Sequence, residues 1–257
     1  AVGGGGWGGT GGCGGAGGGW PASHGEKAGG PGLGGRRRLP QYMANLRHGV
    51  WQQSGLKAAS MPPNFGIGSV LRGKTLGIWG LGKVGQLVAG YGHAFGMKVL
   101  VWGSDDARQR AVALGYTPAL SKEQFFAESD VLSLHLRLSA STTGAVTLED
   151  LLRMKPTATL VNTARAELIE PNALTAALNR GRPGMAAVDV YESEPVLPGQ
   201  PLLRMENCLC TPHIGYVEEE SYELYFNTAF DSVLGFIAGN PVNLVNPEVL
   251  RMTTRRG

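Results

Sequence analysis

Short apolar runs recur along the chain, and helical stretches lie between them. Each run is apolar at successive positions, which is typical of strands buried on both faces of a parallel sheet. The expected strands are Leu76–Trp79, Val99–Trp102, Val131–Leu134, Thr159–Val161, Ala186–Val188 and Cys208–Thr211. The helices expected between them are Gly82–Phe95, Asp106–Leu114, Lys122–Glu128, Leu148–Met154 and Pro171–Asn179. This alternation predicts an α/β fold, with a doubly wound parallel sheet covered by helices on both faces.

The two ends of the chain depart from this alternation. Residues 1–37 are rich in glycine and predict a disordered leader, because glycine tracts lose backbone entropy on ordering and have no side chains to bury. One more helix is expected over Leu39–Trp51 and a last one over Glu218–Ala238. The last helix has an apolar stripe at helical spacing, which comprises Tyr222, Phe226, Phe230, Val233 and Ile237.

Composition separates the leader from the rest of the chain. Of the 41 glycines, 19 lie within the first 35 residues. Residues 1–38 hold four basic residues and one acid, so they account for the whole net charge of +3. The remainder is balanced in charge, and we expect no nucleic-acid partner for it. RNA binding through the Gly/Arg leader stays open as a separate hypothesis.

Cysteine usage and hydropathy indicate where the chain resides. Three cysteines, an odd number, do not make a disulfide framework and favour a reducing compartment. No apolar run approaches the ~18 residues of a membrane span, and the N-terminus lacks the apolar core of a secretory signal. We therefore expect a cytoplasmic protein without a membrane segment. Cys208 and Cys210 share one strand, where we expect their thiols on opposite faces and no metal site.

Gly80-Leu81-Gly82-Lys83-Val84-Gly85 is a GxGxxG motif that directly follows the first expected strand and opens a helix. This context is typical of a dinucleotide-binding (Rossmann) domain. Gly80 is expected to form the tight turn, Gly82 to let the backbone approach a pyrophosphate, and Gly85 to let the helix pack closely on the strand. The pyrophosphate would lie against free N–H groups at the helix N-terminus, near Lys83 and Val84.

The end of the second strand bears on the choice between NAD and NADP. An acid that binds the adenosine ribose is expected about 20 residues after the motif, but Gly103 stands at the strand end and Asp105 lies two residues further on. A missing acid weakens the rejection of a 2′-phosphate, and no arginine replaces it before Arg108. The choice stays open, with Asp105 as the candidate ribose ligand and NAD slightly favoured.

Three later segments follow strands and bring one ionisable side chain each to the carboxyl edge of the sheet, where ligands of α/β folds bind. These side chains are Arg165, Glu194 and His213. Arginine binds a carboxylate through two hydrogen bonds, and histidine exchanges a proton near neutral pH, helped by a neighbouring carboxylate. Taken separately, each residue has an ordinary alternative: a surface cation, a loop charge and a strand-end histidine.

Together these blocks resemble the D-isomer-specific 2-hydroxyacid dehydrogenases, a family that includes phosphoglycerate dehydrogenase and glyoxylate/hydroxypyruvate reductase. The resemblance runs from Arg38 to about Leu250 and rests on residues 71–78, the GxGxxG motif, and residues 154–156, 161–165, 189–195 and 211–215. It implies an NAD(P)-dependent oxidoreductase that interconverts a small D-2-hydroxy acid and its 2-oxo acid. It also implies a homodimer formed through the dinucleotide-binding domain.

The resemblance implies roles for individual residues. Arg165 would hold the substrate carboxylate, His213 would be the acid and base at the substrate oxygen, and Glu194 would pair with that histidine. Further cofactor contacts are implied at Thr163, Ala164, Asp189 and Gly215, with Asp189 near the nicotinamide amide.

Members of the family also have an N-terminal substrate domain, and in this chain the glycine-rich leader stands in its place. The resemblance thus divides the chain into the leader at 1–37, an interdomain helix plus dinucleotide-binding domain at 38–215, and a helix and tail at 216–257 that would pack on a substrate domain. We expect a truncated chain that binds a dinucleotide but reduces 2-oxo acids poorly. A non-catalytic dinucleotide-binding module, like the transcriptional corepressors of the family, is the alternative.

Overall fold

A computed structural model of the chain describes residues 19–49, 51 and 67–244. These residues belong to two compact units, one over Trp20–Tyr216 and one that includes residues 217–244. The predictions for residues 1–18, 50, 52–66 and 245–257, which include the end of the predicted C-terminal tail, lie outside the described residues.

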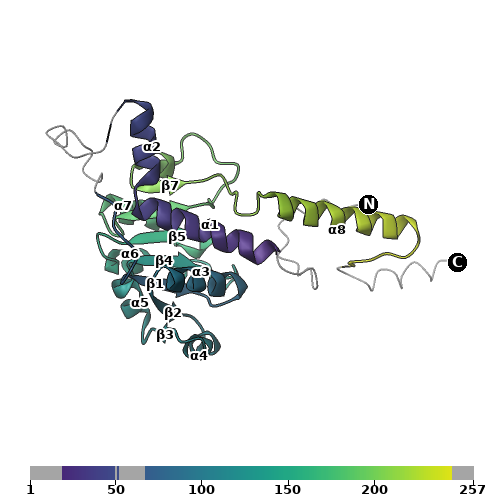
Figure 1. Cartoon of the computed structure of the whole chain (residues 1–257), viewed down its shortest axis with the longest axis horizontal. Coiled ribbons are helices and arrows are strands. Elements are labelled where there is room, and N and C mark those ends of the chain that lie inside the picture. The colour runs from purple at the N-terminus through teal and green to yellow at the C-terminus, as the bar shows by residue number, and fades with distance from the viewer. Residues whose placement is uncertain (1–18, 50, 52–66, 245–257) are drawn as a thin grey trace. The chain divides into compact units, whose positions relative to one another are not determined.

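The larger unit is built on a parallel sheet of seven strands (Figure 1), as the apolar runs predicted. Its spatial order is β3-β2-β1-β4-β5-β6-β7, and every neighbouring pair is parallel. The strands are β1 (Thr75–Trp79), β2 (Lys98–Trp102), β3 (Thr117–Pro118), β4 (Val131–Leu134), β5 (Thr159–Asn162), β6 (Met185–Val188) and β7 (Cys208–Cys210). The direction of winding reverses between β1 and β4, so the carboxyl ends of these two strands flank the crevice where such folds bind ligands.

Helices connect the strands, and most of them occupy the ranges that the sequence predicted. They are α1 (Gly19–Arg36), α2 (Leu39–Arg47), α3 (Lys83–Ala94), α4 (Asp105–Ala113), α5 (Lys122–Glu128), α6 (Leu148–Arg153), α7 (Ala173–Asn179) and α8 (Glu219–Ile237), with 3-10 turns η2 (Ala166–Leu168) and η3 (Pro201–Arg204). The α2 helix ends at Arg47, four residues before the predicted end. The two-residue strand β3 and the two 3-10 turns were not predicted.

Two apolar cores cover the two faces of the sheet, because successive side chains of a strand point to opposite faces. Leu76 and Ile78 of β1 belong to one core, which also contains residues of α1, α3 and α4. Trp79 belongs to the other core, together with residues of α5, α6 and α7. The doubly wound architecture predicted from the apolar runs is therefore confirmed.

The structure corrects the expected disorder for part of the glycine-rich leader, because Gly19–Arg36 forms helix α1. Figure 1 shows α1 on the same side of the sheet as α3. Ala28 is buried in the core that also contains Val88 of α3. At Gly25 a Cβ atom would lie 3.2 Å from Cβ of Leu87, so the absence of a side chain allows close approach of the two helices. Packing against α3 here outweighs the low helix propensity of glycine.

Helix α8 lies in the second unit and carries the predicted apolar stripe. Its five side chains are exposed, from 40% for Tyr222 to 75% for Ile237. The rings of Tyr222 and Phe226 stack with centroids 6.2 Å apart, and those of Phe226 and Phe230 with centroids 6.3 Å apart. The helix begins at a carboxylate cap, since Glu218 accepts hydrogen bonds from the backbone N–H groups of Glu220 and Ser221.

Candidate functional site

The GxGxxG motif forms the turn between β1 and α3. Gly80 has φ of +100°, and a Cβ atom there would lie 2.8 Å from the carbonyl oxygen of His135 at the end of β4. A Cβ atom at Gly85 would lie 2.1 Å from the carbonyl oxygen of Gly80, which permits no side chain. Gly82 precedes α3 and is exposed, with open space where a side chain would be. The turn is therefore tight and leaves the N–H groups at the start of α3 accessible to an anion.

The end of β2 lies beside this turn. The N–H of Gly80 donates to the carbonyl of Trp102 over 3.1 Å, which places Gly103 next to the motif. Asp105 begins α4, its side chain is 84% exposed, and it forms an ion pair with Arg108. The Arg108 guanidinium also lies over the Trp102 ring, 5.2 Å from its centroid. The strand itself thus ends without a carboxylate, and the paired side chains of Asp105 and Arg108 lie just beyond it.

Glu194 and His213 come together, as the sequence led us to expect. Glu194 Oε2 lies 2.6 Å from His213 Nδ1, and each side chain is about one third exposed, at 34% and 35%. His213 adopts a left-handed backbone conformation with φ of +51°. Because Nδ1 is engaged by the carboxylate, the imidazole leaves Nε2 for other partners.

Tyr191 supports this pair from two directions, and the sequence reasoning did not single it out. Its backbone N–H donates to Glu194 Oε1 over 2.9 Å, and its hydroxyl donates to the carbonyl of Thr211 over 3.0 Å. Tyr191 is 6% exposed, and burial raises the pKa of its hydroxyl well above the ordinary value. It therefore stays a neutral donor that ties the Glu194 loop to the segment preceding His213.

Asp189 lies directly after β6 and organises the same segment. It is 1% exposed and accepts hydrogen bonds from Thr211 Oγ1, from the N–H of Ile214 over 3.1 Å and from the N–H of Gly215 over 2.9 Å. Lys27 Nζ of α1 lies 3.7 Å from its Oδ1. The predicted residues Asp189 and Gly215 are thus in contact. Lys27 was missed because it lies in the segment where disorder was expected.

The loop after β5 contains Thr163, Ala164 and Arg165. Asn162, which is buried at the end of the strand, accepts a hydrogen bond from the N–H of Ala164 over 3.1 Å and donates to the carbonyl of Arg165 over 2.9 Å. The Arg165 guanidinium donates to the carbonyl of Ala164 over 2.7 Å. Asn162 fixes this loop, and a polar residue at the end of an apolar strand is the signal that would have found it.

His135 directly follows β4, and its carbonyl oxygen is close to Gly80. Its N–H donates to the carbonyl of Trp79 over 2.8 Å. Its Nε2 atom is buried and has no hydrogen-bond partner among the described residues. Burial lowers the pKa of this imidazole to about 4, so it is neutral at physiological pH.

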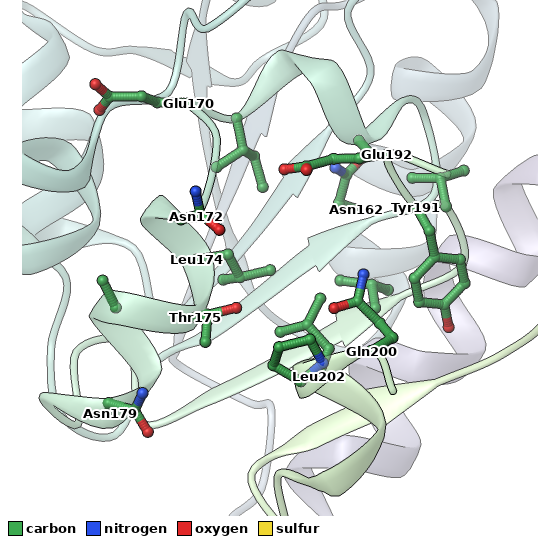
Figure 2. Close-up of a pocket in the computed structure, with 16 residues that line it drawn as sticks. Asn162, Glu170, Asn172, Leu174, Thr175, Asn179, Tyr191, Glu192, Gln200 and Leu202 are labelled. Carbon is green, nitrogen blue, oxygen red and sulfur yellow. The ribbon is translucent and has the colours of Figure 1, made fainter. Parts of the chain in front are cut away.

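A cavity of about 320 Å³ opens elsewhere, between β5, β6, α7 and η3. Figure 2 shows Tyr191 and Glu192 on one side of it and Asn172 and Asn179 on the other. Its lining includes neither the glycine motif nor His213. The Glu194–His213 pair and the contacts of Asp189 lie instead at the carboxyl edge of the sheet, and we place the candidate site there.

The described part of the chain has neither a cluster of metal-ligating side chains nor a helix suited to a membrane. No group of three or more His, Cys, Asp or Glu side chains is arranged to hold a metal ion. None of the helices there is both long enough and apolar enough to cross a membrane.

Comparison with known families agrees with this geometry. Residues 33–215 match the model of the D-isomer specific 2-hydroxyacid dehydrogenase family, NAD binding domain. The chain belongs to this family. The match contains the glycine motif and all three of the ionisable residues that the sequence singled out.

Similar proteins from several organisms support the assignment. A glyoxylate reductase of Aeropyrum pernix is 36% identical over 221 residues, which cover 86% of this chain and 65% of that protein. A putative D-3-phosphoglycerate dehydrogenase from Ralstonia solanacearum has a solved structure with 60% identity and a TM-score of 0.83, covering 88% of this chain and 66% of that one. A phosphoglycerate oxidoreductase from Vibrio cholerae has 51% identity and a TM-score of 0.78, covering 85% and 67%. The chain therefore spans about two thirds of the length of the relatives it matches.

Proposed function

We propose that the chain binds NAD or NADP and transfers hydride between the nicotinamide and a small D-2-hydroxy or 2-oxo acid. The observation that carries this proposal is the Glu194–His213 pair, 2.6 Å apart and following strands of the same parallel sheet as the glycine turn. An acid–base pair and a dinucleotide cradle at one edge of a sheet are what hydride and proton transfer to a carbonyl require. Membership of the 2-hydroxyacid dehydrogenase family supports the substrate class.

The residues around the turn fit a dinucleotide. Gly80 and Gly85 bring the turn and helix close together, and Gly82 leaves room for a pyrophosphate at the N-terminus of α3. The N–H groups of Lys83 and Val84 then lie in the first turn of a helix, where the helix dipole stabilises an anion. On the nicotinamide side, Asp189 would accept from the carboxamide, with Thr163, Ala164 and Gly215 lining the approach. When bound, the nicotinamide supplies or accepts the hydride.

His213 is the general acid and base of the proposed reaction. In the direction of reduction, Nε2 donates to the carbonyl oxygen of the substrate as that oxygen gains charge, and in the reverse direction Nε2 takes the hydroxyl proton. Glu194 holds Nδ1 and thereby fixes the orientation of the ring and stabilises the imidazolium. Arg165 would bind the substrate carboxylate through its guanidinium, which orients the carbonyl carbon toward the nicotinamide.

The end of β2 supports acceptance of both NADH and NADPH. A carboxylate at the position of Gly103 would repel a 2′-phosphate, and the chain has none there. Arg108, which lies over Trp102, is the cation closest in sequence to this position on its C-terminal side. We expect dissociation constants for the two cofactors within about tenfold of each other. The variant Arg108→Gln should weaken NADPH binding and leave NADH binding unchanged.

We further propose that the chain forms a homodimer through its dinucleotide-binding domain, as the family resemblance implies. Light scattering coupled to size-exclusion chromatography measures this directly. The non-catalytic alternative is not favoured, since similar proteins are reductases and dehydrogenases.

Two measurements test the proposed function. Fluorescence titration with NADH measures cofactor binding, and steady-state assays with glyoxylate and hydroxypyruvate measure reduction. The variant His213→Asn, which suits the left-handed conformation at this position, should bind NADH as the wild type does and lose about 10²–10⁴-fold in turnover. Equal turnover of the variant and the wild type would contradict the assignment of His213. The weak turnover expected from the sequence stays a prediction, and the same assay tests it.

A further inference from the structure

Cys208 and Cys210 lie side by side on β7, the edge strand of the sheet. Their Sγ atoms are 3.7 Å apart. We had expected opposite faces for these thiols, and that expectation is wrong: residues two positions apart in a strand share a face, because the side-chain period is two. Both residues are partly exposed, and β7 pairs with β6 as its only partner strand in the described sheet.

The surroundings hold the two sulfur atoms in place. Cys210 Sγ contacts the carbonyl of Leu202, in turn η3, over 3.5 Å, and it interacts with the hydroxyl of Tyr191. Leu202 and Tyr191 also line the cavity in Figure 2, so Cys210 contacts two residues of its wall. The hydrogen bond between the thiols lowers the pKa of Cys210 and raises that of Cys208. Cys210 is therefore the thiol that ionises more easily.

The separation of the sulfur atoms suits a bridging atom better than a direct bond. A disulfide requires sulfur atoms about 2.05 Å apart, with the strand bent to allow it. An atom that lies between the two sulfur atoms could bind both of them. With two bonds of about 2.3 Å, the length found for zinc thiolates, a sulfur–sulfur distance of 3.7 Å corresponds to a sulfur–centre–sulfur angle close to tetrahedral. Soft centres prefer thiolate ligands. The described chain has no group of three or more His, Cys, Asp or Glu side chains that could hold a metal ion. The bound atom must therefore be one that needs only two ligands from the protein.

We propose that Cys208 and Cys210 form a dithiol site that binds soft, thiophilic centres such as trivalent arsenic through both sulfur atoms. With phenylarsine oxide as the probe, both S–H bonds break and two As–S bonds form. The arsenic-bound oxygen leaves as water with the two thiol protons, and arsenic remains As(III). The phenyl group occupies the third position on arsenic and needs no further ligand from the chain.

Intact-mass spectrometry of the full chain tests the site. Wild-type protein treated with one equivalent of phenylarsine oxide should carry one phenylarsenic group that survives excess 2-mercaptoethanol and is removed by dithiothreitol. Cys13→Ser is the matched control, since it removes the remaining cysteine and should keep the adduct. Cys208→Ser and Cys210→Ser should each lose the monothiol-resistant adduct, because one sulfur atom forms only a labile bond.

A second measurement needs no variant at either site cysteine. Treatment with phenylarsine oxide should protect Cys208 and Cys210 together from alkylation by N-ethylmaleimide, as read by peptide mapping, and leave Cys13 reactive. The proposal is overturned if the wild-type adduct washes off with monothiol, if either single-serine variant keeps it, or if alkylation of the two cysteines is not blocked together.

Discussion

The backbone N–H of Tyr191 donates to Glu194 Oε1 over 2.9 Å, which leaves Glu194 Oε2 for His213 Nδ1. The two oxygens of this carboxylate thus have different partners: one accepts from a backbone N–H, and the other contacts the imidazole. The hydroxyl of the same tyrosine reaches the carbonyl of Thr211, two residues before His213. Tyr191 therefore connects both members of the pair, and we regard it as a positioning residue for them.

Tyr191→Phe should keep the backbone donor and lose the hydroxyl contact with Thr211. We expect a fall in kcat of about three- to tenfold with an unchanged dissociation constant for NADH, since a hydrogen bond of this kind contributes about 1 kcal/mol. Tyr116→Phe, in the connection between α4 and β3, is the control and should leave kcat unchanged. A parallel loss of kcat and NADH affinity would indicate general damage to the fold instead of a positioning role.

Asp189→Asn should loosen the segment from Thr211 to Gly215. The amide has one acceptor oxygen in place of two, and its NH₂ group would face an N–H donor. We expect a loss of about 1–3 kcal/mol in the free energy of unfolding and weaker NADH binding. Denaturant unfolding and fluorescence titration measure the two effects. Thr211→Val removes only one of the donors to Asp189 and should cause smaller losses of stability and NADH affinity. If Thr211→Val caused the larger losses, Asp189 would not be the residue that holds this segment in place.

Gly85→Ala and Gly90→Ala form a matched pair within α3. The new methyl group at residue 85 would lie 2.1 Å from the carbonyl oxygen of Gly80, so the turn must open. We expect a loss of at least about 2 kcal/mol in stability, together with loss of NADH binding. At residue 90 no atom beyond the neighbouring residues and the backbone of the helix itself lies within 4 Å of the new methyl group, and alanine should stabilise the helix by about 0.5–1 kcal/mol. Similar melting temperatures for the two variants would contradict the close packing at Gly85.

His135 should make the fold sensitive to mild acid. Its pKa is about 4 in the folded chain and about 6.5 when unfolded, so the unfolded state binds more protons between these values. Stability from this group is therefore present above pH 6.5 and falls as the pH drops toward 4. Between pH 7 and pH 5 we expect a loss of about 2 kcal/mol in the free energy of unfolding. In His135→Asn this contribution should vanish; an identical pH dependence in variant and wild type would show that His135 is not the cause.

Much of the sheet could be predicted from the sequence because its strands are buried on both faces. Val131–Leu134 is apolar enough to be found with its observed bounds, whereas Thr117–Pro118 is too short to give a pattern. The position of Glu194 and His213 at one edge of the sheet could also be predicted, since parallel strands have their carboxyl ends at one edge. Their pairing was implied by the family resemblance.

The contacts that could not be predicted depend on tertiary packing, which the pattern of residue types along the sequence does not determine. Helix α1 forms over a glycine-rich segment because Ala28 and Gly25 pack against α3. The contact between Lys27 and Asp189 depends on this helix, so it could not be predicted while the segment was expected to be disordered. Tyr191 and Asn162 act through the geometry of single hydrogen bonds, which composition and spacing leave undetermined.

The left-handed backbone at His213 affects how substitutions there are to be interpreted. Only a few residue types, chiefly glycine, asparagine and aspartate, adopt φ near +51° without strain. A valine or isoleucine at this position would combine the loss of the imidazole with a distorted chain. In a saturation library sorted for folding alone, we expect glycine and asparagine to be enriched at residue 213. The substitutions that still allow folding would then be determined by the backbone conformation, and not by the loss of the proton-transferring imidazole.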